Sequence, residues 1–457
     1  MDPGVRLLDD DTVLVGGSPL RILRLTRRGA DIVAAWRGGR RCEGPTELTL
    51  ARHLLDGGLV HPRPVPGAAG PGDVTVVVPV RDRADALARC LAALGPCDRV
   101  LVVDDASRDP DRIAAAAAAH GARVIRRGTS GGPAAARNAG LAHASTPYVA
   151  FVDSDCRPEP GWLETLLPHF QDPAVAALAP RVVPADGTGW IDRYDSCRSS
   201  LDLGPAEAPV VPRSRVAYVP AAALVVRRSA VGSGFDVART VGEDVDLVWR
   251  LWEAGWTVRY VPSARVVHDP RRTVAGWAAR RFAYGTSAAP LAAAHPGQVP
   301  PVVLSGWSLT AWALALAGRP DAALGVVAAA SGLMARRLPL REGRMAEGAR
   351  LAGLGTLAVG EALAATVTQV WWPVAVPAAL VSRRARRAVV AAALARPALV
   401  WLRNRPQSDP LRFGAACLLD DLVYGAGVWW GCLREGTVEP LLPQLMGRIP
   451  VTRRPAD

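Results

Sequence analysis

Residues 74–83 read VTVVVPVRDR, and this stretch decides the class of fold. Its apolar residues form a continuous run that ends in three charged side chains. A run that is apolar at every position is typical of a strand buried on both faces of a sheet. The same pattern recurs at RVLVVDD (99–105) and YVAFVDSD (148–155), with helical stretches between these runs. Strands that alternate with helices predict an α/β domain with a parallel sheet covered on both faces, and we expect it over residues 73–290.

Three further regions are predicted around this domain. Residues 1–60 contain two short alternating runs and two stretches with helical spacing, which predicts a strand pair and a helix-turn-helix, with Thr26 and Thr46 as candidate N-caps. Residues 61–72, HPRPVPGAAGPG, are so rich in proline and glycine that we expect a linker. Residues 291–457 are rich in alanine, leucine and arginine, and we expect a helical, apolar region there.

The composition excludes several classes of protein. Of the 457 residues, 50% are hydrophobic and 21% are charged, which argues against extended disorder. The 7 cysteines are scattered and form no CxxC pair, so we expect a reducing compartment and no structural zinc. The N-terminal MDPGVRLLDDD is acidic and lacks a basic stretch followed by an apolar run, so we expect no secretory signal, and the formal charge of +12 favours an anionic partner.

Two charge-free apolar stretches in the C-terminal region indicate contact with a membrane. They cover residues 302–318 and 362–382, and arginines follow both of them, including the run RRARR at 383–387. The second stretch is long enough to span a bilayer. Arginines beside an apolar segment favour an anionic cytoplasmic leaflet, so we expect attachment at the cytoplasmic face of the cell membrane. A buried helical bundle is the alternative, because Pro373 and Pro377 interrupt the longer stretch.

Acidic residues follow two of the buried runs. Asp153 and Asp155 come directly after YVAFV as a D-x-D pair, and ligands of open α/β sheets bind beyond the carboxyl ends of the strands. Carboxylate oxygens are suitable ligands for Mg²⁺ or Mn²⁺. Such an ion would neutralise the charge that develops on a diphosphate leaving group. A lone D-x-D is also common in solvated turns, but the strand context favours a metal site.

A second acidic pair and a glycine-rich segment add candidates for donor binding. Asp104 and Asp105 could accept hydrogen bonds from a base and a ribose, or form a turn that caps the next helix, and both can hold. In GTSGGPAAARNAGL (128–141) the glycines would let the backbone approach a ligand closely. Arg137 in this segment is either a contact to phosphate or a base carbonyl, or a surface arginine.

Two more candidates lie further along the chain. The stretch VGEDVDLVWRLWEAGW (241–256) predicts an amphipathic helix with Glu243 and Asp244 in its first turn. The helix dipole stabilises acids there, but such a carboxylate could also be the general base that takes a proton from an acceptor hydroxyl. His268 ends another predicted strand in VPSARVVHDPR (261–271), and a metal ligand, a phosphate contact and a structural role remain open for it.

Five motifs together resemble family 2 of the glycosyltransferases. These motifs are VVVPVRDR, VVDDAS, GGPAAARNAG, FVDSD and GEDVDL, in this order and spacing. The resemblance implies the GT-A nucleotide-diphospho-sugar transferase fold, and recognition of the nucleotide base by Asp105 with help from Arg81 or Asp82. GWAARRFAYG (276–285) stands where processive members carry Q-x-x-R-W, so synthesis of long polymers is not expected.

The same resemblance implies the chemistry of the site. Asp153 and Asp155 would form the D-x-D motif that holds Mn²⁺ or Mg²⁺. His268 falls where members place a contact to the metal or the diphosphate. Asp244 would be the catalytic base, and the transfer would invert the configuration of the sugar.

The resemblance extends beyond the α/β domain. The whole chain is similar to glycosyltransferases of the mycofactocin system, which also carry a basic, apolar C-terminal region. Residues 1–60 resemble the PqqD-type winged-helix fold, which implies that they bind a ribosomal peptide by adding it to a sheet edge. The implied reaction is transfer of glucose from UDP-glucose to a peptide-derived redox cofactor or its precursor peptide.

Two alternatives differ from this interpretation. The first is a membrane glycosyltransferase that acts on a cell-envelope lipid or polysaccharide, which the apolar C-terminal segments would serve equally well. The second is a DNA-binding regulator that uses the predicted helix-turn-helix. Its second helical stretch, TELTLARHLLDGG, mixes acids with arginine, so the basic footprint of a DNA-binding helix is absent and we expect no nucleic acid partner.

Overall fold

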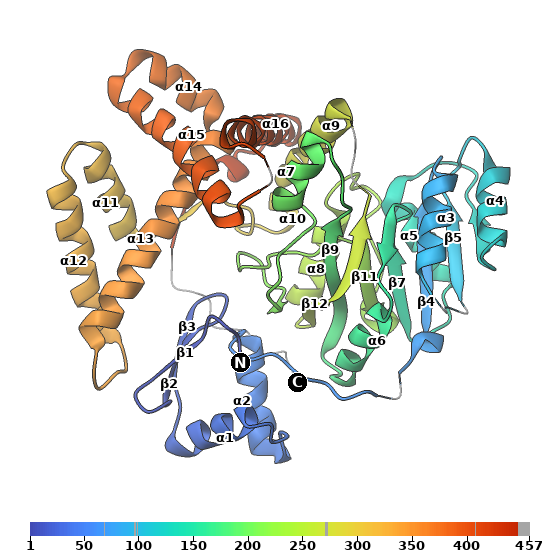
Figure 1. Ribbon diagram of the computed structural model, residues 1–457, viewed down its shortest axis with the longest axis horizontal. Coiled ribbons are helices and arrows are strands. Elements are labelled where there is room, and N and C mark those ends of the chain that lie inside the picture. Colours follow the sequence, from blue (N-terminus) through green and yellow to red (C-terminus); the bar gives the residue numbers. More distant parts are fainter. Residues whose placement is uncertain (68, 96, 98, 270–272, 407, 447–457) are drawn as a thin grey trace. The chain divides into compact units, whose positions relative to one another are not determined.

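The computed structural model describes residues 1–67, 69–95, 97, 99–269, 273–406 and 408–446 (Figure 1). Contacts within the chain divide it into two compact units. The first is an α/β unit that contains Asp2 and the described residues from 54 to 269. The second, the helical unit, combines residues 3–53 with the helices that follow residue 273, so the helices just after the sheet group with this unit.

Within the described residues, the α/β unit contains one sheet of 9 strands in the order β10-β12-β9-β11-β7-β4-β5-β6, with β8 paired to β12. The strands are β4 (Val74–Val80), β5 (Val100–Asp104), β6 (Arg123–Arg126), β7 (Tyr148–Val152), β8 (Cys156–Pro158), β9 (Val175–Pro184), β10 (Ala208–Pro209), β11 (Ala223–Arg227) and β12 (Thr257–His268). The helices are α3 (Ala84–Ala93), α4 (Pro110–Ala118), α5 (Gly132–His143), α6 (Trp162–Leu166), α7 (Trp190–Arg198) and α8 (Glu243–Glu253).

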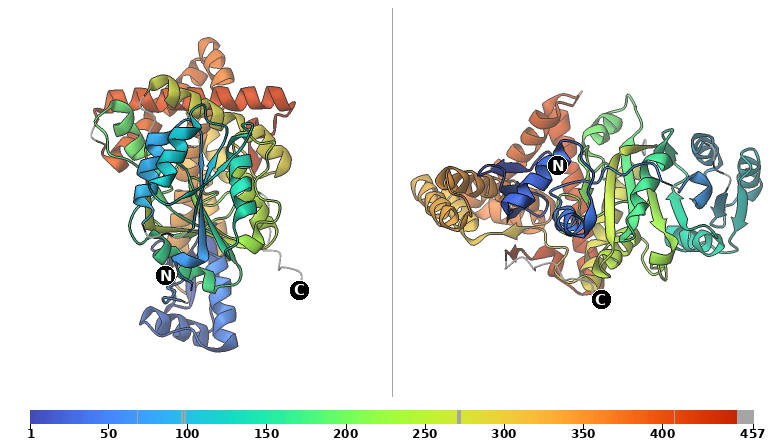
Figure 2. Two further views of the ribbon diagram at one scale, coloured as in Figure 1. Left: turned by 90° about the vertical axis from the view of Figure 1, so that its right-hand side faces the viewer. Right: turned by 90° about the horizontal axis from the view of Figure 1, so that it is seen from below.

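The centre of this sheet agrees with the sequence prediction, but its far half does not. Val76, Val77 and Val78 of β4 are fully buried, because helices cover both faces of the sheet (Figure 2). β4 pairs in parallel with β5 and with β7. β11, however, runs antiparallel to β7 and to β9, so the expected parallel sheet is in fact mixed. A strand buried on both faces has the same apolar run in either direction, which is why the sequence pattern does not reveal this strand's direction.

The predicted linker lies against the α/β unit. Gln171 donates a hydrogen bond from Nε2 to the carbonyl of Val65 at 2.7 Å, and Arg63 pairs with Glu207 at 3.1 Å. His61 Nε2 lies 2.9 Å from the carboxylate of Asp2. The described linker residues therefore lack strands, as the proline content predicts, and are nevertheless held in place.

The N-terminal part of the helical unit has one strand more than predicted. It contains β1 (Arg6–Leu8), β2 (Val13–Gly16), β3 (Arg21–Arg24), α1 (Arg27–Arg37) and α2 (Gly44–Asp56), and the three strands form one antiparallel sheet. Thr26 caps α1 as predicted, because its hydroxyl accepts a hydrogen bond from the amide of Gly29 at 3.1 Å. The prediction for Thr46 is wrong, since α2 already begins at Gly44.

The remaining helices of this unit divide the two apolar stretches. They are α9 (Val274–Thr286), α10 (Ala288–Ala294), α11 (Gly306–Leu316), α12 (Pro320–Arg337), α13 (Arg344–Gln369), α14 (Trp372–Val381), α15 (Arg383–Asn404) and α16 (Pro410–Glu435). The stretch 302–318 contains the short strand β13 (Val303–Leu304) and α11, and 362–382 is split between α13 and α14 at residues 370–371. In the described part of the chain, α13 is the one helix long and apolar enough to cross a membrane.

Candidate active site

Three adjacent parallel strands bring the predicted residues to one edge of the sheet. β4 lies between β7 and β5. Asp153 follows β7, Arg81 and Asp82 follow β4, and Asp104 ends β5. Because parallel strands end on the same side, the polar side chains that the sequence singles out share the carboxyl edge of the sheet, where ligands of open α/β sheets bind.

Asp105 lies at the centre of the first cluster on this edge. Its carboxylate accepts hydrogen bonds from the amides of Gly131 and Gly132, at 3.0 and 2.9 Å, and from the hydroxyl of Ser130 at 2.8 Å. Arg127 also pairs with it. Burial alone would raise the pKa of Asp105, but the hydrogen bonds outweigh burial and lower the pKa. Asp105 is therefore ionised at neutral pH and fixes the glycine pair at the start of α5.

Arg81 connects this cluster to the end of β4. Its guanidinium donates a hydrogen bond to the Ser130 hydroxyl at 2.9 Å, and that hydroxyl in turn donates to Asp105. The side chain of Arg81 is largely exposed, so its charge can meet an anionic ligand at this edge. Of the predicted donor contacts, Arg81 and Asp105 thus lie in one hydrogen-bonded group.

Asp104 and Asp82 hold the turns that follow the strands. Asp104 accepts a hydrogen bond from the amide of Ser107 at 2.9 Å and pairs with Arg126, and it is almost fully buried. Asp82 accepts a hydrogen bond from the amide of Arg108 at 2.7 Å. The backbone of Asp82 has φ 57°, a left-handed conformation that is uncommon for residues other than glycine. The sequence allowed Asp104 to form a turn, to contact the donor, or to do both. The structure shows the turn.

Asp155 and His268 form the second cluster. The Nε2 atom of His268 lies 3.8 Å from Asp155 Oδ1, and Arg83 pairs with Asp155 Oδ2. The neighbouring carboxylate of Asp269 forms ion pairs with the guanidinium groups of Arg89 and Arg157, with N–O distances of 2.8 and 3.1 Å. Among the described residues no three histidine, cysteine or acidic side chains converge on a single ion position. Asp155 and His268 are close enough to bind one ion together, but the remaining ligands of that ion would have to come from elsewhere. Substrate phosphates commonly provide such ligands for Mg²⁺.

Arg137 joins the D-x-D motif to the start of α8. One Nη atom donates to Asp153 at 2.8 Å and the other to Glu243 at 2.6 Å. The Arg137 side chain is only 4% exposed, and its guanidinium lies over the ring of Phe235, 5.3 Å from the centroid. The sequence offered a ligand contact or a surface arginine for this residue. Its burial favours a third role, in which Arg137 holds two carboxylates of the site in place.

Asp244 lies beside this buried ion pair. Its carboxylate accepts hydrogen bonds from the amide of Ala221 at 3.1 Å and from its neighbour Val245 at 2.8 Å. The next residue, Ala222, accepts a hydrogen bond from the amide of Asp153 at 2.9 Å, so one short backbone segment connects the two acids. Burial raises the pKa of Asp244, although the positive charge of Arg137 opposes the shift. Burial and the charge of Asp244 likewise raise the pKa of Glu243.

Asn138 is a site residue that the sequence analysis missed. Its side-chain amide donates to the carbonyl of Phe235 at 2.8 Å and accepts from the amide of Phe235 at 2.8 Å. The ring of Phe235 packs edge-on against Phe151 at 5.0 Å and touches Arg137. Asn138 thereby ties α5 to the loop that leads into Glu243 and Asp244. Its position next to Arg137 was the one signal in the sequence. The signal was weak, because Phe235, the partner of Asn138, lies 97 residues away along the chain.

Removal of this clamp should loosen the loop before α8. We expect Asn138→Ala to lose two hydrogen bonds, to lower the free energy of unfolding by about 1–3 kcal/mol and to reduce kcat more than donor affinity. Hydrogen exchange should become faster in the segment around Phe235. His143→Ala is the control, because among the described residues the side chain of His143 bonds to its own helix alone, at the carbonyl of Ala139. Unchanged exchange around Phe235 in Asn138→Ala would contradict the clamp.

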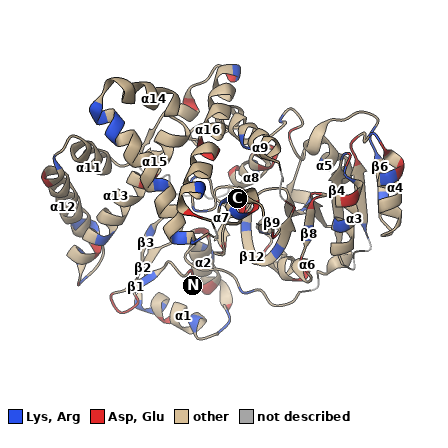
Figure 3. Cartoon of the chain, turned by 45° about the horizontal axis from the view of Figure 1, so that its top comes forward, with Lys and Arg blue, Asp and Glu red and all other residues tan. Residues whose placement is uncertain are grey.

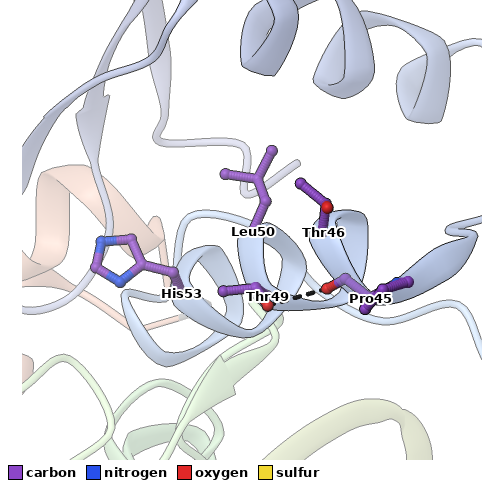
Figure 4. Close-up of a pocket in the computed structure, with 5 residues that line it drawn as sticks. All are labelled: Pro45, Thr46, Thr49, Leu50 and His53. Carbon is purple, nitrogen blue, oxygen red and sulfur yellow. Dashed lines mark hydrogen bonds between the residues drawn. The ribbon is translucent and has the colours of Figure 1, made fainter.

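A surface hollow on the helical unit contains none of the predicted site residues. It lies on α2 and is lined by Pro45, Thr46, Thr49, Leu50 and His53 (Figure 4). The hydroxyl of Thr49 donates to the carbonyl of Pro45 at 2.9 Å, within the same helix. The carboxyl edge of the sheet therefore remains the candidate active site.

Comparison with known proteins identifies the class to which this fold and site belong. Residues 75–231 match the family model described as glycosyl transferase family 2, and these residues include β4 to β11 and the D-x-D motif. The chain belongs to the family 2 glycosyltransferases and is a glycosyltransferase.

The chain is also similar to individual proteins. The chain is 44% identical over 459 aligned positions to the Pre-mycofactocin glycosyltransferase of Mycobacterium tuberculosis, and the alignment covers 97% of each protein. It is 30% identical over 219 positions to the succinoglycan biosynthesis protein ExoU of Rhizobium meliloti, which covers 44% of this chain and 61% of that protein. A mannosyltransferase of Pyrobaculum calidifontis, solved with GDP-Man and Mn²⁺, superposes with a TM-score of 0.40 at 22% identity, over 72% of this chain and 97% of that chain.

Proposed function

We propose that this protein transfers a hexose, glucose from UDP-glucose, with inversion of configuration onto a peptide-derived redox cofactor of the mycofactocin system or its precursor peptide. The observation that carries the proposal is the buried Arg137, which holds Asp153 of the D-x-D motif and Glu243 beside Asp244 in one cluster. This arrangement supports a single site in which donor and base act on the same sugar. The named relative, similar along almost its full length, supports the choice of acceptor.

In the proposed reaction, the acceptor hydroxyl attacks the anomeric carbon from the side opposite the diphosphate. The new carbon–oxygen bond forms while the bond to the diphosphate oxygen breaks, and the nucleotide diphosphate leaves with that electron pair. Asp244 takes the proton of the attacking hydroxyl. The raised pKa of its carboxyl suits this role, because a base works best when its pKa lies nearer the working pH.

The donor would lie along the carboxyl edge of the sheet. Asp105, with Arg81 and Asp82 nearby, is proposed to meet the base and ribose, with Asp104 supporting the same turn. Two contacts support this assignment. Asp105 accepts a hydrogen bond from the amide of Gly131, and Asp82 accepts one from the amide of Arg108 in the turn after β5. Arg137 would contribute indirectly, by fixing Asp153 of the D-x-D motif, which would meet the donor phosphates through the metal ion.

We propose that Asp153 and Asp155 of the D-x-D motif and His268 hold Mn²⁺ or Mg²⁺ with the donor phosphates completing the ligand set, since among the described residues these three side chains do not converge on one ion position by themselves. A bound ion would supply charge stabilisation to the diphosphate leaving group. The chemistry of the donor set fits such an ion, because carboxylate oxygen and imidazole nitrogen are suitable ligands. The local charge also fits, since Asp153, Asp155, Glu243 and Asp244 outnumber the two guanidinium groups that pair with them.

The acceptor would be recognised in part by residues 1–60, as a PqqD-like peptide-binding module. β3 forms one edge of its small sheet, and Ile22 on this strand is exposed. An extended peptide could add to such an edge through main-chain hydrogen bonds. This would bring a ribosomal peptide, or the cofactor derived from it, to the enzyme.

A cell-envelope lipid or polysaccharide is the second candidate acceptor, favoured by the partial similarity to a succinoglycan biosynthesis protein. Deletion of the gene separates the two candidates. Redox cofactor that accumulates without sugar supports the first proposal. Normal cofactor glycosylation with altered envelope glycans would favour the second.

The donor and metal assignments are tested with purified protein, Mn²⁺ and a panel of UDP-sugars. We expect UDP release from UDP-glucose that stops on chelation of the metal. Asp155→Ala should abolish metal-dependent donor binding, because it removes the ligand nearest His268. Asp85→Ala is the matched control, since this exposed carboxylate at the start of α3 pairs with the exposed Arg112 and with no other cation in the part of the chain that the structure describes. Full metal-dependent binding by Asp155→Ala would refute the metal assignment.

A further inference from the structure

We propose that the helical unit attaches to an anionic membrane leaflet from one side only, through α14 and the first turns of α15, and that α13 does not cross the bilayer. The proposal concerns a surface outside the active site and holds whichever sugar and acceptor the enzyme uses. Its occupant is a lipid leaflet rich in anionic headgroups. Three observations on the helical unit carry it.

The first observation is the apolar surface of α14. None of its residues is buried, although the helix carries no charge. Leu380 is 77% exposed and Val381 88% exposed, and Val374 and Val376 are exposed as well. Contiguous apolar side chains open to solvent mark a surface that contacts a partner or a membrane.

The second observation is the charge that follows this helix. Exposed arginines stand at positions 383, 384, 386 and 387, in the first two turns of α15, and Figure 3 shows the blue segment beside α14. α15 continues with exposed Val390 and Leu394. Arginines adjacent to an apolar surface are complementary to anionic headgroups at the depth where the apolar side chains insert. An anionic leaflet satisfies both features, whereas an uncharged apolar partner satisfies only one.

The third observation concerns the first end of α13. Val13 and Val15 of β2 form a buried cluster with Leu338, Leu340 and Leu351, at and just before the start of α13. In addition, Arg6 of β1 pairs with Glu347 in the first turn of α13. The N-terminal sheet is therefore packed on this end of the helix.

The other end of α13 packs on helices that follow the α/β unit in sequence. Val370 packs with Ala288 and Ala289 of α10, and the chain from the last sheet strand to these helices is short, because β12 ends at His268 and α9 begins at Val274. A crossing α13 would thus place the N-terminal sheet and the α/β unit on opposite sides of the membrane.

The chain does not permit that separation. α2 is joined to β4 by a proline-rich segment between residues 57 and 73. Its described residues contain no helix or strand apart from the short 3-10 turn Pro71–Asp73, and they are hydrogen-bonded within the α/β unit through Val65 and Arg63. A segment of irregular backbone exposed to lipid does not cross a bilayer. Both ends of α13 consequently lie on the same side of the membrane. The helical unit therefore contacts the membrane surface and does not cross it.

The lipid surface is tested by pelleting the full-length protein with vesicles. We expect binding to phosphatidylcholine–phosphatidylglycerol vesicles and little to phosphatidylcholine alone. The double variant Leu380→Asp and Val381→Asp, and the replacement of the four arginines by glutamine, should each weaken binding at least about tenfold. Leu324→Asp with Leu333→Asp is the matched control, because both leucines are exposed on α12 of the same unit. Equal binding to neutral vesicles, or equal loss in the control, would overturn the proposal.

Topology is tested in cells with single cysteines at Glu342 and Arg383, which are exposed positions on either side of α13 and α14. We expect neither cysteine to react with a membrane-impermeant maleimide in intact cells and both to react after permeabilisation. Labelling of one position alone in intact cells would mean that the chain crosses the membrane. Neither measurement depends on catalysis, so a failure of the proposed reaction leaves both outcomes readable.

Discussion

Replacement of Asp244 by asparagine is expected to lower the rate of glycosyl transfer by about 10²- to 10⁴-fold while donor binding is retained. Asparagine has nearly the same shape and can still accept a hydrogen bond from the amide of Ala221. It cannot accept the proton of the attacking hydroxyl. Transfer is measured as UDP release in the presence of acceptor, and donor affinity by calorimetry. Wild-type turnover by Asp244→Asn would exclude this residue as the base.

Asp246→Asn is the control for this experiment. Asp246 lies in the same helix, half a turn further on, but its carboxylate is engaged by Arg250 at 2.8 Å and Arg239 at 3.3 Å. Its loss should therefore reduce stability more than it reduces turnover of the folded enzyme. A pattern in which both variants lose activity equally would point to damage of the helix rather than to removal of a base.

The pH dependence provides an independent check of the same residue. Because burial raises the pKa of Asp244, the carboxyl loses its proton only at a pH above the ordinary aspartate value of about 3.9. The acid limb of kcat/KM should accordingly lie above that value, with activity falling as the pH drops through the raised pKa. The residual activity of Asp244→Asn should lack this limb. The same shift means that ionisation of Asp244 destabilises the fold as the pH rises through its raised pKa.

The local elements of the fold could be predicted where a pattern has only one structural meaning. The short, β-branched apolar run of β4 favours a strand buried on both faces, which the structure shows, and the acids at Glu243 and Asp244 do open a helix. The direction of β11 could not be predicted, because burial on both faces is indifferent to strand direction. The break at residues 370–371 had a signal in Pro373, which the sequence analysis read as an interruption of the apolar stretch and which lies in the first turn of α14. The packing of Val370 against α10 and α16 places the break.

In the candidate site, the sequence identified the acids but not what holds them. Strand ends are visible in a sequence, so Asp105, Asp153 and Asp155 could be named from their position alone. The partners of these acids lie far away along the chain, and no periodicity records such contacts. Arg137 and Asn138 are examples, since their bonds to Glu243 and Phe235 span 106 and 97 residues. The positioning groups of this site therefore needed a structure, whereas the candidate reacting groups did not.

Arg137→Leu is expected to lower the free energy of unfolding by about 3–5 kcal/mol, because it leaves Asp153 and Glu243 without their buried partner. Arg137→Lys should lose less, since an ammonium group keeps the charge but cannot bond both carboxylates in the geometry of the guanidinium fork. Chemical denaturation measures both values. The control is Arg112→Leu, which breaks an exposed pair with Asp85 and should cost at most about 1 kcal/mol.

The same substitution should also change the titration of the base. The charge of Arg137 lowers the pKa of Glu243 and of Asp244 against the effect of burial. Without that charge both pKa values rise. The acid limb of kcat/KM should therefore move to higher pH in Arg137→Leu, and by a smaller amount in Arg137→Lys, which keeps the charge. A merely structural arginine would reduce the amount of folded enzyme but leave the pH profile in place. A shifted limb in folded protein would therefore assign Arg137 to the electrostatics of the site, and an unshifted limb would confine it to stability.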